Sequence, residues 1–359
     1  MEGWKGAGVG VQVSGFRKEC EGDGMPMNET EDRLLARMSG RAMDAHEGYY
    51  DMRFVCMGTE NRIAFAAETR GRAVAFRDEC LRWLARFEAT YSVFLDDSLI
   101  SRINREAWRD WVAIDADTEQ IFAICDWLHW KTRGVMDPTM GPLLTLWDWR
   151  VPHAELPDVG AIADGLTRVG WKKVQRSGGR VRFAVEGMLV DLGGIGKEFA
   201  VDRVITLAAR HNITNILVDL GHDIRVAGMP PEGGAWRLGL EHPDAPGRCW
   251  GGVVLTNEAL CGSGNYLRFF ERGGEQFGHI LDPRNGRPVN NGCRAAWVIA
   301  PTATEAGALS TAALILGVEE GMRLIDETYQ AAGCIWCGDK LHQTRRFANH
   351  VAENEAVRA

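Results

Sequence analysis

Segments with strand-like and helix-like patterns do not alternate regularly along this chain, and their order restricts the folds that it can adopt. Helical periodicity is found over residues 71–90 and again over 117–134, whereas short apolar runs separated by glycines fill most of residues 214–282. A doubly wound parallel sheet needs strands and helices in alternation, so this order argues against that architecture. We therefore expect an α+β protein with mixed or antiparallel sheets.

Apolar periodicity locates several further elements. Residues 51–68 are expected to form two strands around a tight turn. Residues 157–169 and 302–327 are expected to be helical, the second with a glycine break between two segments. The helix over residues 71–90 has an apolar face that consists of Phe76, Cys80, Trp83, Leu84 and Phe87.

Length and charge exclude some classes of function. The 359 residues suffice for one large domain or two smaller ones. A net charge of −8 argues against general binding to nucleic acid or to an anionic membrane, although a local basic pocket for a phosphorylated ligand is compatible with it. No apolar run approaches the length of a membrane span, so we expect no membrane insertion. The first twenty residues lack the basic-then-apolar pattern of a secretory signal, and we expect a cytoplasmic location.

The nine cysteines are scattered, and an odd number of them does not suggest a disulfide framework. Cys334 and Cys337 form a single C-x-x-C pair, which is compatible with a redox or zinc site. There is no second pair, and the surrounding apolar pattern favours a late strand instead.

The segment DLGGIGK (191–197) stands where a strand gives way to a helix. A Walker loop would have a glycine in place of Asp191 and a Ser or Thr after Lys197, and a dinucleotide fingerprint would need a third glycine. Neither motif matches. Free N–H groups at a helix start, together with Lys197, still favour an anion. The alternative is a tight strand-to-helix turn with Lys197 at the surface.

Three other segments offer reactive side chains. His279 precedes a turn and is placed to act as a general base near neutral pH, or it is a satisfied histidine at a strand end. The segment SGNY (263–266) offers a hydroxyl and backbone donors to a ligand, or is a hairpin turn. Ser310 and Thr311 lie on an expected helix, where their hydroxyls can bond back to the preceding turn.

Eight segments in a fixed order resemble the FAD:protein FMN transferase (ApbE) family. They are MGT (57–59), DDSLISRIN (96–104), DPTMGPL (137–143), DLGGIGK (191–197), LGHDI (220–224), SGNY (263–266), HILDPRNGRP (279–288) and ALST (308–311). The match runs from about Phe54 to about Asp339. It divides the chain into an N-terminal extension (1–50, partly disordered or helical), a transferase domain (51–345) and a C-terminal tail (346–359).

The resemblance implies a fold of two mixed α/β lobes with the flavin site in the cleft between them. It implies an enzyme that cleaves the pyrophosphate of FAD, attaches FMN to a Thr or Ser hydroxyl of an acceptor protein and releases AMP. It also implies a divalent metal, usually Mg²⁺, with Mn²⁺ as an alternative. The chain has no Ser/Thr-Gly-Ala-Ser/Thr run, so we expect the acceptor to be another protein.

Site residues follow from the same resemblance. His279 matches the family's catalytic histidine, and the metal would be held by the backbone carbonyl near Gly194 and the hydroxyl of Thr311. Lys197 would lie on the phosphate side, and Phe94 would stack on the flavin. The expected contacts with FAD are Met57, Phe94, Val135, Met136, Asp137, Asp191, Lys197, Ile280 and Leu281.

Three positions depart from the family pattern. Gly307 replaces an Asp that helps to hold the metal, Glu198 replaces a glycine after the lysine, and His222 replaces the second glycine of a G-G-D run. Magnesium prefers anionic oxygen ligands, and a histidine would suit manganese or zinc better. A working transferase would complete the metal site with phosphate oxygens, water or an unidentified side chain. The alternatives are an FAD-binding protein without transferase activity and an FAD pyrophosphatase.

Overall fold

The computed structural model describes residues 27–39, 43–151, 153 and 155–352. Its centre is a nine-stranded sheet in which every neighbouring pair of strands is antiparallel. In spatial order the strands are β1 (Asp44–His46), β2 (Tyr49–Cys56), β3 (Thr59–Ala66), β7 (Ile216–Leu220), β8 (Asp223–Ala227), β11 (Ala259–Gly264), β16 (Cys293–Ala300), β17 (Ala332–Cys337) and β18 (Lys340–Gln343). The expected α+β class with antiparallel sheets is confirmed.

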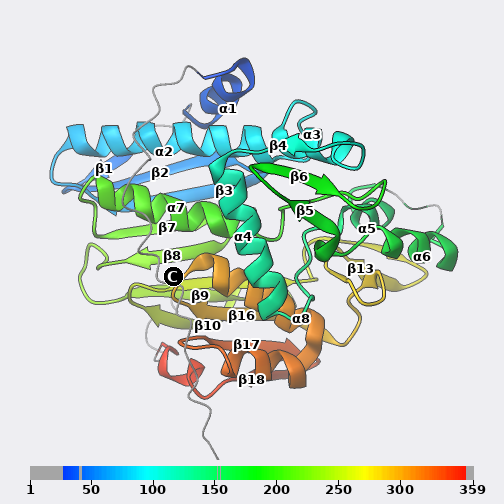
Figure 1. Cartoon of the computed structure of the whole chain (residues 1–359). Helices are drawn as coiled ribbons and strands as arrows, with labels where there is room; N and C mark the ends of the chain where they lie inside the picture. Colours follow the sequence, from blue (N-terminus) through cyan, green and yellow to red (C-terminus); the bar gives the residue numbers. More distant parts are fainter. Residues whose placement is uncertain (1–26, 40–42, 152, 154, 353–359) are drawn as a thin grey trace, which may run out of the picture.

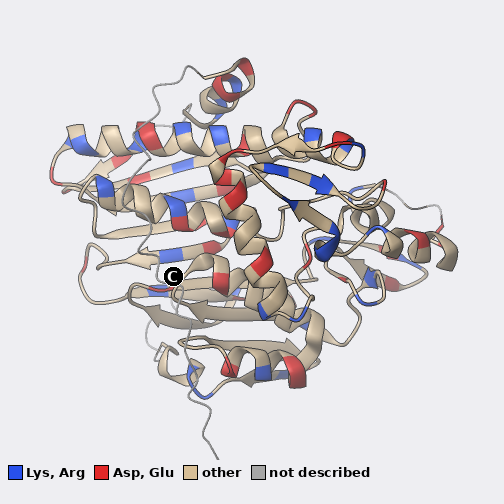
Figure 2. Cartoon of the chain, in the orientation of Figure 1, with Lys and Arg blue, Asp and Glu red and all other residues tan. Residues whose placement is uncertain are grey.

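Three long helices, α2 (Arg70–Tyr91), α7 (Gly196–Arg210) and α8 (Ala303–Asp326), pack against this sheet (Figure 1). The helix α1 (Glu29–Ser39) packs on α2, and α4 (Ala116–Lys131) crosses in front of the sheet. Acidic and basic residues are interspersed along α2 (Figure 2). Within the described residues, none of the helices is both long and apolar enough to cross a membrane.

Smaller elements surround the sheet. The three-stranded sheet, in spatial order, is β4 (Val112–Ala113), β6 (Arg180–Phe183) and β5 (Val174–Arg176). The hairpins are β9 (Trp236–His242) with β10 (Ala245–Leu255), β12 (Phe269–Arg272) with β13 (Glu275–Gly278), and β14 (Leu281–Asp282) with β15 (Arg287–Pro288). Short helical segments are α3 (Leu99–Glu106), α5 (Gly141–Leu146), α6 (Val159–Thr167) and the 3-10 turns Trp171–Lys173 and Phe347–Asn349.

The central sheet is buried on both faces. Along β7, Ile216 and Val218 enter the main core under the helices, while Leu217 between them enters a second core on the opposite face. Side chains alternate between the faces of a strand, so each face needs its own cover. The hairpin β9–β10 provides that cover for the second core through residues such as Trp236 and Leu240.

Several expected elements are confirmed, including a helix within the expected N-terminal extension. The helix expected over residues 71–90 is α2, and the helix at 302–327 is α8, with its break at Gly317. Phe347, which lies in the expected C-terminal tail, is fully buried in the second core. Helix α1, inside the expected extension, contributes two buried side chains to the main core. The remainder of that extension, residues 1–26 and 40–42, lies outside the described residues.

The C-x-x-C pair belongs to a strand, as the apolar pattern indicates. Cys334 lies within β17 and is buried, and Cys337 ends the same strand. Both are free thiols.

Candidate active site

Two hairpin turns meet at one end of the central sheet. The β2–β3 turn holds Met57 at φ 51°, and its backbone N–H donates to the Glu88 carboxylate at 2.9 Å. The β7–β8 turn lies beside it, since a Cβ on Gly221 would stand 3.0 Å from the hydroxyl oxygen of Thr59. His222 occupies this turn at φ 72° and is exposed. The pairing of β3 with β7 thus brings the MGT and LGHDI segments together.

Asp223 begins β8 beside this turn and receives the ammonium group of Lys197. The Nζ–Oδ2 distance is 2.8 Å, and both side chains are largely buried. Burial opposes the charge of Lys197, but the carboxylates of Asp223 and Glu198 outweigh it and hold the pKa of Lys197 above its ordinary value. The lysine is therefore a fixed cation inside the protein and not a surface side chain at a turn.

Helix α7 begins at Gly196 without a side-chain cap. The loop before it is tightly wound, because the backbone N–H groups of Ile195 and Gly196 both donate to the carbonyl of Leu192. This geometry leaves the helix start free to face a ligand, and Lys197 lies one residue inside it.

Glu198 follows the lysine and is 5% exposed. Its Oε2 atom has no hydrogen-bond partner within the part of the chain that the structure describes. Burial raises the pKa of this carboxyl to about 7, although Lys197 acts in the opposite direction. Such a group is unusual, since a buried carboxylate is normally paired.

Helix α8 and strand β11 bring together three hydroxyl groups, those of Ser263, Ser310 and Thr311. The Ser263 hydroxyl bonds to those of Ser310 and Thr311, each at 2.8 Å, and the Ser310 hydroxyl also donates to the carbonyl of Gly307 at 2.9 Å. The expected back-bonding on the helix is confirmed for Ser310. For Thr311 the structure shows a bond across to the strand instead.

His279 lies directly after β13 and before β14, not within a strand. Its Nδ1 atom is 3.2 Å from the carbonyl oxygen of Arg268. A carbonyl can only accept, so this bond places the proton on Nδ1 and leaves Nε2 as the basic atom. Burial, together with the positive charges of Arg268 and Lys197, lowers the pKa of His279 to about 4. The imidazole is therefore neutral at pH 7, and the influence of Lys197 places the two residues in one electrostatic group.

Phe94 is 71% exposed, and the Arg150 guanidinium lies 4.7 Å from the centre of its ring. Arg150 also acts on the half-buried Asp191: desolvation raises the pKa of this carboxyl, and the Gly193 N–H and then Arg150 partly offset the rise. Asp191 accepts a bond from the Gly193 N–H at 2.7 Å. Arg150 thus connects two of the expected flavin contacts. Nothing in the sequence pointed to Arg150 beyond its position in an irregular loop.

The carboxylate of Asp137 is hydrogen-bonded to neighbouring residues of the protein. One oxygen accepts bonds from the N–H and hydroxyl of Thr139, and the other accepts from the N–H of Trp171 at 2.9 Å. Its neighbours Val135 and Met136 are buried in the main core, and the methyl of Met136 would lie 3.7 Å from a Cβ on Gly194. This loop therefore forms a rigid wall beside the start of α7.

Ile280 and Leu281 are also buried, in the main core and in a third, smaller core respectively. Both follow His279 directly in the chain, so their packing holds the segment that carries the histidine. Their predicted role is therefore one of support for the histidine.

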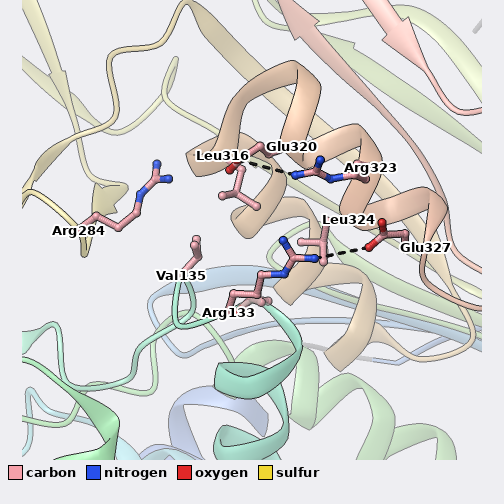
Figure 3. Close-up of a pocket in the computed structure, with 9 residues that line it drawn as sticks. Arg133, Val135, Arg284, Leu316, Glu320, Arg323, Leu324 and Glu327 are labelled. Carbon is pink, nitrogen blue, oxygen red and sulfur yellow. Dashed lines mark ion pairs between the residues drawn. The ribbon is translucent and has the colours of Figure 1, made fainter.

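A cavity of about 200 Å³ opens beside this region. It lies between the loop after α4 and the second half of α8, and Arg284 faces across it (Figure 3). Arg133 and Arg323 pair with Glu327 and Glu320 at 3.8 Å each. Arg284 pairs with Asp282. Of the expected flavin contacts, the cavity is lined only by Val135.

No group of three or more His, Cys, Asp or Glu side chains in the described ranges is arranged to hold a metal. Any metal here must therefore use a mixed donor set. The candidate oxygen donors are the hydroxyl of Thr311, the backbone carbonyl of exposed Gly194 and Oε2 of Glu198, which follows Lys197 in the chain. Hard oxygen donors of this kind suit Mg²⁺ or Mn²⁺. Among the same described residues, no further His, Cys, Asp or Glu side chains gather with His222 into a set that would select zinc.

The family is established by comparison with known proteins. The model of the ApbE family matches residues 57–336, and the chain belongs to this family. The FAD:protein FMN transferase of Treponema pallidum is 29% identical over 295 residues, which cover 77% of this chain and 82% of that protein. The transferase of the same name from Haemophilus influenzae is 30% identical over 249 residues, which cover 67% and 72%.

Solved structures agree with this assignment. The ApbE protein from Thermotoga maritima superposes with a TM-score of 0.77 at 28% identity, covering 85% of this chain and all of the other. A variant of the flavin transferase ApbE from Vibrio cholerae superposes with a TM-score of 0.75 at 25% identity, covering 84% and 99%. The fold is thus that of the family.

Proposed function

We propose that this protein transfers FMN from FAD to a Thr or Ser hydroxyl of an acceptor protein and releases AMP. The proposal is carried by two neighbouring features: a buried cation, Lys197, held by Asp223, and a neutral histidine, His279, whose Nδ1 bonds to the Arg268 carbonyl so that Nε2 is the basic atom. Relatives that match about three quarters of the chain bear the name of this activity.

In this reaction an acceptor oxygen forms a bond to the FMN phosphorus while the bond to the bridging oxygen breaks and AMP departs. Lys197, held in place by Asp223, would balance the charge of the pyrophosphate. His279 would take the proton of the attacking hydroxyl at Nε2, since its Nδ1 is already bonded to Arg268. The base is in its active, neutral form at pH 7 because its pKa is about 4.

A divalent metal, Mg²⁺ or Mn²⁺, would neutralise further charge on the phosphates when bound. Thr311 and the carbonyl near Gly194 are the proposed ligands. The Thr311 hydroxyl is oriented by its bond to Ser263, and the loop at Gly194 is backed by Met136. These residues fit a hard cation, because all their donor atoms are oxygens.

The flavin would lie against the exposed ring of Phe94, with Arg150 and Asp191 at its side. Met57, Val135, Met136 and Asp137 would shape the pocket. Ile280 and Leu281 would support the segment that carries His279.

The partner would be a separate acceptor protein with a Thr or Ser flavinylation site. The acceptor site and the cytoplasmic location stay predictions.

The test mixes the purified protein with FAD, Mg²⁺ and an acceptor domain that bears a Ser-Gly-Ala-Thr site. We expect AMP in solution and a fluorescent acceptor band on a denaturing gel. AMP with free FMN and no labelled acceptor would instead indicate a pyrophosphatase. Binding of FAD without any AMP, with either Mg²⁺ or Mn²⁺, would indicate a flavin-binding protein and contradict the proposal.

A further inference from the structure

The contact between α7 and α8 contains a carboxylate in an unexpected position. Gly307 on α8 has no side chain, and the space beside it is filled by Glu198 from α7. A Cβ built on Gly307 would lie 2.5 Å from Cγ of Glu198 and 2.8 Å from its Oε1. The carboxylate of Glu198 therefore occupies the volume that a short acidic side chain at position 307 would use.

Asp202 determines how the two helices meet. Its carboxylate accepts bonds from the N–H groups of Ala303 and Thr304, each at 2.9 Å, and is also paired with Arg225. Asp202 lies one turn after Glu198, and Ala303 lies one turn before Gly307. The first turn of α8 is thus fixed to α7. The contact of Glu198 with Gly307 lies one turn closer to the start of α7 and one turn further into α8.

The proposed metal ligands lie close to these two residues along the chain. Four residues beyond Gly307 on α8 is Thr311, and Gly194 lies in the loop just before α7 begins at Gly196. Residues four apart lie on the same face of a helix, so Thr311 shares the face of Gly307 that receives Glu198. The open Oε2 of Glu198 has no protein partner in the described chain, whereas the oxygens of Asp202 are satisfied by neighbours.

We propose that Glu198 supplies the carboxylate of the metal site, in place of a carboxylate at position 307. The donor set would then be one carboxylate from α7, one hydroxyl from α8 and one backbone carbonyl from the preceding loop. A bound divalent cation would compensate a carboxylate oxygen that is otherwise buried without a partner, which is costly in a protein interior. This inference rests on the proposed function only in assuming that a metal is used.

The test is a titration of the full chain with Mn²⁺, with and without FAD. The concentration of free Mn²⁺ is measured from its electron paramagnetic resonance signal. We expect Glu198→Gln to weaken Mn²⁺ binding by at least about tenfold while the protein remains folded, because the isosteric amide keeps the packing but loses the charge. The matched control is Glu305→Gln, which removes a partly buried carboxylate from α8. We expect the control to bind Mn²⁺ like the wild type.

An exchange of the two positions sharpens the test. Gly307→Asp alone is expected to lower the melting temperature, because its Cβ would clash with Glu198. Glu198→Gly alone is expected to fold and to lose Mn²⁺ affinity. The double variant is expected to regain both the melting temperature and the Mn²⁺ affinity. Unchanged binding in Glu198→Gln, or a double variant that binds no better than Glu198→Gly, would overturn the inference.

The outcome can be separated from that of the proposed function by assaying FMN transfer in parallel. A wild type that binds Mn²⁺ through Glu198 but transfers no FMN would refute the transferase and leave this assignment standing. A wild type that transfers FMN, beside a Glu198→Gln variant with undiminished Mn²⁺ affinity, would refute this assignment alone.

Discussion

Two buried carboxylates flank the start of α7, and the protein treats them in opposite ways. Asp137 accepts three hydrogen bonds from Thr139 and Trp171 and so holds the loop after α4 in one shape. Glu198 is equally buried, but its Oε2 has no partner in the described chain. A satisfied carboxylate stabilises the frame, whereas an open one is available to a ligand. The difference separates residues that build the site from residues that act in it.

His279 belongs with the open groups, because only one of its two ring nitrogens is held. We expect His279→Ala to lower the rate of FMN transfer by about 10²–10⁴-fold, the usual contribution of a general base. The affinity for FAD should change little, since the flavin is held by other residues. Transfer is measured as labelled acceptor per unit time, and FAD binding by quenching of flavin fluorescence. A variant that loses FAD binding would show that the histidine serves the pocket and not the proton transfer.

The two carboxylates should also differ in stability. Asp137→Asn loses a charge-assisted bond from the Trp171 N–H, so we expect the free energy of unfolding to fall by about 2 kcal/mol. Glu198→Gln, measured without metal, should change it by less than about 1 kcal/mol because the charge it removes is poorly paired. Urea unfolding compares the two variants directly. An equal fall in the free energy of unfolding in both variants would show that Glu198, like Asp137, stabilises the fold, and would contradict the distinction drawn between them.

The pH profile of the reaction reports on His279. Because burial lowers its pKa to about 4, we expect kcat/KM for FAD to fall by less than about twofold from pH 7 to pH 5, where an unperturbed histidine would lose most of its basic form. The unfolded chain binds this proton more readily than the folded one, so stability should also fall as the pH drops from 6.5 toward 4. A fall of kcat/KM with an apparent pKa near 6.5 that is absent in His279→Ala would contradict the assignment of His279 as a base with a lowered pKa.

The smallest effect is expected at His222, which holds φ 72° in an exposed turn. His222→Gly relieves this backbone conformation but increases the freedom of the unfolded chain, so we expect a gain of at most about 1 kcal/mol in stability. Mn²⁺ affinity should not change, which thermal unfolding and the Mn²⁺ titration would check together. A loss of metal binding would place His222 among the ligands.

Much of this fold could be predicted from local pattern. The apolar face over residues 71–90 and the glycine break in α8 lie in the chain itself, and both are confirmed. The burial of Phe347 could not be predicted, because a single apolar residue near the end of the sequence has no periodicity that reveals it. The order of the site segments was sufficient to indicate the family, which the family comparison confirms.

The relation between Glu198 and Gly307 could not be predicted. The two residues are more than one hundred positions apart, and each appears in the sequence only as an isolated departure from a pattern. They become one feature when α7 and α8 are packed together through Asp202. Arg150 was missed for a similar reason, since its contacts with Phe94 and Asp191 depend on tertiary structure.

The most direct measurement is anomalous scattering at the manganese edge from crystals grown with Mn²⁺. We expect one peak between the Glu198 carboxylate and the Thr311 hydroxyl, at coordination distance from both. The same experiment on Glu198→Gln should lose that peak. A peak in the wild type that does not touch Glu198, or one that persists unchanged in the variant, would contradict the assignment of the carboxylate to α7.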